Sequence, residues 1–198
     1  MPRAEARQES GVDGDPAILW VGRLNANKDP LTVLDGLEQC ARTLPGARLT
    51  MVYGEDDDLP AVQARLTGSA VLRSRVRLVG RVEHERMPAF YSAADLFLLG
   101  SHHEGSGYAA LEACACGVVP VVTDIPAFRV ITAGGSLGGL WQPGDASDCA
   151  RVLADVASRD LRAMSARVAE HFGHALSWDA VGRAAVAAYR DVLSKRIV

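Results

Sequence analysis

Short apolar runs alternate with helix-like segments along this chain of 198 residues. The runs are nearly unbroken instead of alternating in polarity, which indicates strands covered on both faces. They lie at 17–22, 48–54, 76–79, 95–99, 118–123 and 138–141. Between them, apolar residues recur at helical spacing, as at Leu31, Leu34 and Leu37. The pattern predicts an α/β fold: a Rossmann-like, doubly wound parallel sheet of about six strands with helices on both faces and extra C-terminal helices.

The domain organisation follows from where the polar stretches lie. Residues 1–16 are polar and mixed in charge, so we expect a flexible lead-in or linker there. Residues 17–198 are expected to form one domain, because a chain of this size can bury roughly 70% of its unfolded surface. A last helix is expected over residues 178–195, after the final strand.

Charge and hydropathy exclude several classes of protein. There are 21 Lys and Arg against 24 Asp and Glu, a formal net charge of −3, which argues against nucleic-acid binding. No run approaches the roughly 20 apolar residues of a transmembrane helix, and the N-terminus lacks the apolar core of a secretory signal. We expect a cytoplasmic protein, and peripheral association of the full-length protein with a membrane is left open.

The four cysteines carry no ligand pattern. Cys40, Cys114, Cys116 and Cys149 are irregularly spaced, unlike the cysteines of a zinc site or a disulfide framework. They are therefore interpreted as reduced packing residues, and no metal site is predicted.

Two cations follow the first predicted strand. In open α/β sheets, ligands bind beyond the carboxyl ends of the strands. Gly22 and Arg23 lie at that point, and Lys28 follows five residues later. Arginine offers a planar fork of donors suited to phosphate, and lysine offers a mobile point charge. An anionic ligand and solvated surface charges are both compatible with this spacing.

A glycine-rich turn follows the fourth predicted strand. Gly105, Ser106 and Gly107 let the backbone approach a ligand closely, and the helix expected from Tyr108 offers free N–H groups to an anion. His102 and His103 precede the turn and are interpreted as polar loop residues rather than acid–base catalysts.

Two glutamates lie in the same region. Glu112 lies in an apolar helix, where a carboxylate needs a partner, either a core arginine or a ligand hydroxyl. Eight residues of helix turn through about 800°, which leaves about 80° between Glu104 and Glu112, so both can reach one cleft. Together with the cations, they suit a ligand with two anionic groups and several hydroxyls, such as a sugar nucleotide.

Two sequence motifs make the prediction of a sugar-nucleotide ligand more specific. The run VGRLNANKD (Val21–Asp29) keeps an Arg-x4-Lys spacing, and EGSGYAALEACACG (Glu104–Gly117) keeps a Glu-x7-Glu spacing. Both resemble the C-terminal, donor-binding half of family 4 retaining glycosyltransferases of the GT-B fold, the glycosyl transferases group 1. The segments LVGRVEHERMPAFYSAADLFLLGSHHEGSG and VVPVVTDIPAF are also similar to that family. The resemblance extends from about Ala17 to Val156.

The resemblance implies a role for each matched residue. Arg23 and Lys28 would contact the donor diphosphate, Glu104 the donor sugar, and Glu112 the ribose hydroxyls. The backbone of Val82 would meet the base, and the loop amides would face sugar and phosphate. The catalytic residues implied are Arg23, Lys28 and Glu104; the substrate-binding residues implied are Gly22, Val82, Gly105, Ser106, Gly107, Tyr108 and Glu112.

The resemblance also implies a reaction and its partners. A sugar would pass from a nucleoside diphosphate sugar to a hydroxyl of an acceptor glycan or other compound, in glycan biosynthesis, without a metal or other cofactor. The chain is about half a GT-B enzyme, so it would lack the N-terminal acceptor domain and be inactive alone. Two departures stand out: Ser106 replaces a usual Phe, and Gly100 replaces a common Pro. A stand-alone, non-catalytic nucleotide-sugar binding module and a sugar-nucleotide epimerase of related fold are the alternatives.

Overall fold

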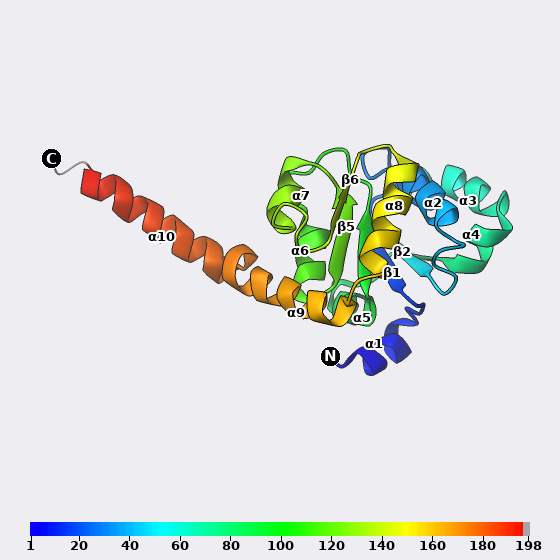
Figure 1. Ribbon diagram of the computed structural model, residues 1–198, viewed down its shortest axis with the longest axis horizontal. Helices are drawn as coiled ribbons and strands as arrows, with labels where there is room; N and C mark the ends of the chain where they lie inside the picture. Colours follow the sequence, from blue (N-terminus) through cyan, green and yellow to red (C-terminus); the bar gives the residue numbers. More distant parts are fainter. Residues whose placement is uncertain (196–198) are drawn as a thin grey trace.

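The computed structural model describes residues 1–195. Its centre is a single parallel β-sheet (Figure 1). Its strand order is β3-β2-β1-β4-β5-β6, and every neighbouring pair is parallel. The strands are β1 (Ala17–Gly22), β2 (Arg48–Tyr53), β3 (Val76–Gly80), β4 (Leu96–Leu99), β5 (Val119–Thr123) and β6 (Gly139–Trp141). The predicted doubly wound α/β fold is confirmed. The direction of winding reverses between β1 and β4, which is where such sheets bind ligands.

Helices cover both faces of the sheet (Figure 1). They are α1 (Arg3–Ser10), α2 (Pro30–Gln39), α3 (Leu59–Thr67), α4 (Ala70–Arg75), α5 (Met87–Ala93), α6 (Tyr108–Ala115), α7 (Pro126–Ile131), α8 (Ala146–Ala157), α9 (Leu161–His171) and α10 (Trp178–Lys195). A short 3₁₀ turn, η1 (His84–Arg86), precedes α5, and a π-helical turn, η2 (Phe172–Leu176), follows α9. Helix α2 packs against α8, α1 against α5, and α6 against α9.

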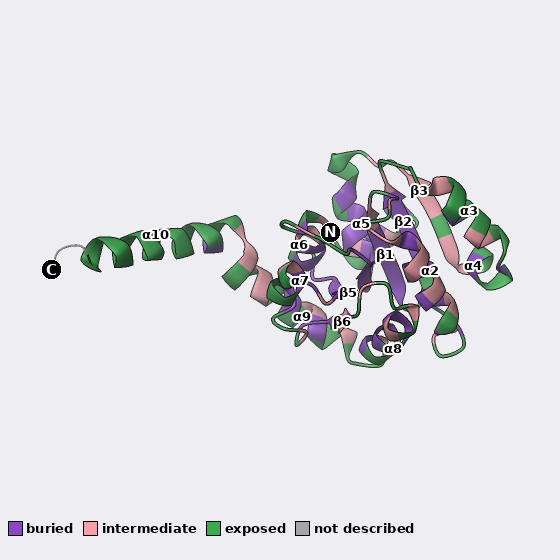
Figure 2. Ribbon diagram, turned by 90° about the horizontal axis from the view of Figure 1, so that it is seen from above, coloured by how far each residue is buried: buried purple, intermediate pink, exposed green. Residues whose placement is uncertain are grey.

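The core lies between the sheet and these helices (Figure 2). Trp20 and Trp141 are fully buried there. Gly36 lets α2 approach α8 closely, since a Cβ at this position would lie 2.7 Å from the Cys149 sulfur. The four cysteines are free, and burial raises the pKa of Cys40 to about 11. Cys116 is exposed, whereas the sequence placed it in packing.

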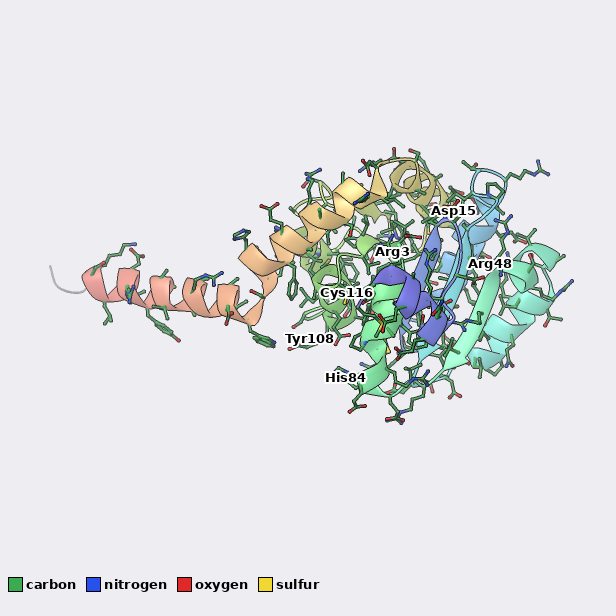
Figure 3. All side chains as sticks on the ribbon, turned by 90° about the horizontal axis from the view of Figure 1, so that it is seen from below. Arg3, Asp15, Arg48, His84, Tyr108 and Cys116 are labelled. Carbon is green, nitrogen blue, oxygen red and sulfur yellow. The ribbon has the colours of Figure 1, made fainter. Side chains whose placement is uncertain are left out.

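The first residues differ from the expected flexible lead-in. Residues 3–10 form α1, whose Ala6 is fully buried against the domain. Arg3 and Arg7 donate to the Asp95 carboxylate at 2.6 and 2.9 Å (Arg3 is labelled in Figure 3). The folded unit therefore includes residues before position 17. Local periodicity could not show this, because the anchor lies some 90 residues away.

Helix α10 projects away from the rest of the chain (Figures 1 and 2). Ala180 is its buried residue, and it carries six exposed apolar side chains: Trp178, Val181, Val186, Tyr189, Val192 and Leu193. At 100° per residue these six lie within a sector of about 140°, which makes an apolar stripe. No helix within residues 1–195 combines the length and apolar character needed to cross a bilayer.

Candidate functional site

A cavity of about 570 Å³ opens at the carboxyl edge of the sheet. It lies beyond the ends of β1 and β2, and its other walls are formed by the segment between β3 and α5 and by α6. It brings together four residues singled out from the sequence: Gly22, Arg23, Val82 and Glu112. The other lining residues are Val21, Val52, Tyr53, Gly54, Glu55, Arg81, Glu83, His84 and Met87.

Arg23 provides a positive charge at the end of β1. Its side chain is 61% exposed and makes an ion pair with Glu55, with 3.5 Å between Nη1 and Oε2. The backbone N–H of Leu24 donates to the Glu55 carbonyl at 2.9 Å, which fixes the β1 end against the β2 end. The guanidinium is therefore placed on the cavity wall and remains accessible to an anion.

Lys28 and Glu104 lie beside this cavity and not in its wall. They bind each other, with side chains 14% and 11% exposed, and Ser101 Oγ donates to Glu104 Oε1 at 2.7 Å. The Lys28 stem passes over Gly22, since a Cβ at Gly22 would lie 3.5 Å from Lys28 Cγ. An expected arrangement with all four charged side chains around one cavity is thus not what the structure shows. Two part-buried opposite charges pair because each would otherwise be desolvated alone.

Glu112 has a partner that the sequence did not identify. Its Oε2 accepts a hydrogen bond from the Tyr91 hydroxyl at 2.8 Å, so the core arginine considered from the sequence is not its partner. Burial, and then the charge of Glu112, raise the pKa of Tyr91 well above its usual range, so the phenol stays protonated and donates. Glu112 lines two cavities at once, which leaves its carboxylate within reach of a ligand.

The glycine-rich turn contributes one residue to the wall of a second cavity, of about 340 Å³. Ser106 and Tyr108 line it together with Glu112 and with apolar residues of α6, η2 and the start of α10. Gly107 has φ 69°, and a Cβ there would lie 3.0 Å from Phe128, so this position requires glycine. Gly107 caps α6 without a side-chain hydrogen bond, which leaves the first N–H groups of the helix for an anion.

The two cavities lie on one side of the domain. His84, from the first, and Tyr108, from the second, lie in the same part of the view in Figure 3, apart from Arg48 at the start of β2, and Glu112 lines both cavities. Among residues 1–195, no cluster of three or more potential metal ligands is present. Sequence reasoning missed Tyr91, Ser101 and the charged residues between β3 and α5. Ser101 had a signal, since it lies two residues after the end of β4.

Comparison with known proteins gives the family. The family model described as Glycosyl transferases group 1 matches residues 2–175. The D-inositol 3-phosphate glycosyltransferase of Mycolicibacterium smegmatis is 31% identical, over 97% of this chain and 44% of that protein. This chain therefore spans less than half of that relative.

Solved structures share the fold. Sucrose-phosphate synthase from Thermosynechococcus elongatus superposes with a TM-score of 0.77 at 24% identity, covering 98% of this chain and 50% of that one. The Anabaena protein HepE, solved in complex with UDP and glucose, has a TM-score of 0.64 at 21% identity, covering 87% and 51%. With the family match over most of its length, the chain belongs to the glycosyl transferases of group 1.

Proposed function

We propose that this chain is the donor-binding half of a family 4 retaining glycosyltransferase. The enzyme would move a sugar from a nucleoside diphosphate sugar to a hydroxyl of an acceptor glycan or other compound. The observation that carries the proposal is the cavity that places Arg23 and Glu112 together, next to the uncapped start of α6, in a member of this family. HepE, with the same fold, binds UDP and glucose.

The charges around the cavity suit departure of a diphosphate. Negative charge builds on the leaving diphosphate in the transition state, and donors aimed at that charge lower the barrier. Arg23, Lys28 and the first N–H groups of α6 would supply those donors. An ammonium group has three N–H bonds, so Lys28 can contact a phosphate oxygen while it keeps Glu104. No metal is assigned to this step.

The resemblance to the family implies the remaining roles, and the positions of these residues support them. Glu112 would bind the ribose hydroxyls and the backbone of Val82 would meet the base, since both line the larger cavity. Glu104, held by Lys28 and Ser101, would face the donor sugar beside the loop from Gly105 to Tyr108.

An acceptor-binding half would complete the enzyme. This chain covers 44% of the M. smegmatis relative, and α10 carries an apolar stripe with no partner within residues 1–195. Residues 17–198, together with α1, would form the donor domain, and the isolated chain would be inactive in transfer. A cytoplasmic location is supported by the four free cysteines.

Product analysis of the full-length enzyme tests this function. We expect sugar transfer from a nucleoside diphosphate sugar only when an acceptor is present, with retention of the anomeric configuration in the product by NMR. A changed sugar nucleotide without acceptor would indicate an epimerase instead, and binding without any turnover would indicate a binding module.

Glu112 allows a separate test on this chain. Replacing Glu112 with Gln should weaken binding of a nucleoside diphosphate about tenfold in calorimetry, because hydrogen bonds to a charged acceptor contribute about 1.5–3 kcal/mol and those to a neutral acceptor about 0.5–1.5 kcal/mol. Tyr91→Phe is the matched control: it removes the other end of the 2.8 Å hydrogen bond and leaves the carboxylate in place. Equal affinity of Glu112→Gln and the parent chain would contradict the ribose role.

A further inference from the structure

Two loops at the carboxyl edge of the sheet are joined by hydrogen bonds. The β1–α2 loop (residues 23–29) carries Arg23 and Lys28, and the β4–α6 loop (residues 100–107) carries Glu104. The backbone N–H of His102 donates to the Asn27 carbonyl at 2.8 Å, and Asn27 Nδ2 donates to the His103 carbonyl at 3.0 Å. The two loops therefore exchange hydrogen bonds directly beside the Lys28–Glu104 pair.

The side chains of Asp29 and His102 add a further connection. His102 Nε2 lies 3.0 Å from Asp29 Oδ2, and since a carboxylate only accepts, the imidazole donates its Nε2–H. The other Asp29 oxygen, Oδ1, accepts from the Thr32 N–H at 3.2 Å and caps α2. Both carboxylate oxygens are thus engaged, one with its own helix and one with the opposite loop.

The backbone around this contact is adapted to it. Asp29 has φ 43°, in the left-handed region that residues other than glycine seldom adopt, and such conformations concentrate where the surrounding structure fixes a site. Gly100 admits the close approach, because a Cβ there would lie 3.0 Å from the Asp29 carbonyl oxygen and 3.1 Å from that of Lys28. The glycine that replaces a common proline of the family is thus at the point where the loops meet.

We propose that Asp29 and His102 form a latch that positions Lys28 and Glu104 for the donor, and that His102 is a positioning residue and not a catalytic acid or base. The proposal rests on the proposed function. His102 contacts the cap of α2, and its ring lies 3.6 Å from the Cβ position of Gly144. It is not among the residues lining either cavity. His102 would therefore affect the reaction indirectly, by fixing the position of the β1–α2 loop and with it the Lys28 ammonium.

Hydrogen exchange on the full chain tests whether the latch exists. His102→Ala should increase amide exchange in both loops, 23–29 and 100–107, while His103→Ala, the matched control one residue away, should leave it unchanged. His102→Gln should restore protection, since a glutamine amide can present an N–H near the position of Nε2. Equal exchange in His102→Ala and His103→Ala would overturn the latch whether or not a nucleotide binds.

Calorimetry with UDP, GDP and ADP then tests what the latch positions. We expect His102→Ala to weaken binding of the preferred diphosphate about tenfold, with recovery in His102→Gln. In a Lys28→Met background, His102→Ala should change affinity less than twofold, because no ammonium remains to be positioned. Equal losses in both backgrounds would overturn the positioning role. If none of the three diphosphates binds the parent chain, the proposed function fails, and the positioning role fails with it even where exchange shows the latch.

Discussion

Replacing Arg23 with Ala in the full-length enzyme is expected to lower kcat by roughly 30- to 1,000-fold. Removing one preorganised donor from a developing negative charge costs about 2–4 kcal/mol of transition-state stabilisation. Folding stability should change little, because the Arg23–Glu55 pair is 61% exposed on both sides and such pairs contribute about 0–1 kcal/mol. Steady-state kinetics and thermal unfolding of the same preparation measure the two effects separately.

Arg48→Ala is the matched control for this result. Arg48 is also an exposed arginine in an ion pair, at 3.0 Å from Asp13, but it begins β2 at the opposite edge of the sheet. Its loss should leave kcat unchanged. Similar kcat values for Arg23→Ala and Arg48→Ala would refute the assignment of Arg23 to the leaving diphosphate.

Replacing Lys28 with Met should lower both stability and turnover. Glu104 is 11% exposed and would lose its cation, keeping only the Ser101 hydrogen bond. Leaving a part-buried carboxylate without its counter-charge should cost about 2 kcal/mol, which for a chain of this size lowers Tm by about 4–8 °C. Turnover of the full-length enzyme should fall by about 100-fold, because a donor to the diphosphate is lost.

The double variant Lys28→Met with Glu104→Gln separates these two effects. Removing both charges of a buried pair is often close to neutral for stability, so the Tm should recover most of the loss. Turnover should stay as low as in the single variant or fall further. Recovery of turnover together with Tm would show that Lys28 acts through folding alone and would contradict its proposed contact with the donor.

The fold could be predicted from the sequence because its strands have a strong local signal. A strand covered on both faces must be apolar at successive positions, and β1 and β5 show this without interruption. The placement of Arg23 and Glu112 near one another also followed from the sequence. Residues that come after neighbouring parallel strands meet at one edge of the sheet, whatever their separation in the chain.

The features that the sequence did not predict depend on contacts between residues far apart in the chain. The Tyr91 hydroxyl reaches Glu112 across 21 positions, and Arg3 and Arg7 reach Asp95 across about 90, with no periodic pattern to signal either contact. The pairing of Lys28 with Glu104 was not anticipated for a different reason. The sequence analysis assigned both residues to a ligand, whereas two part-buried side chains of opposite charge can also form an ion pair with each other.

Thermal unfolding of the chain with nucleoside diphosphates and their sugars tests the donor site most directly. A ligand at 100 times its dissociation constant adds about 2.7 kcal/mol of stability, which for a chain of this size raises Tm by about 5–11 °C. We predict such a rise with at least one nucleoside diphosphate, and a rise reduced by half or more in Arg23→Ala but not in Arg48→Ala. An unchanged Tm with every diphosphate and sugar nucleotide at millimolar concentration would contradict a donor site at the carboxyl edge of this sheet.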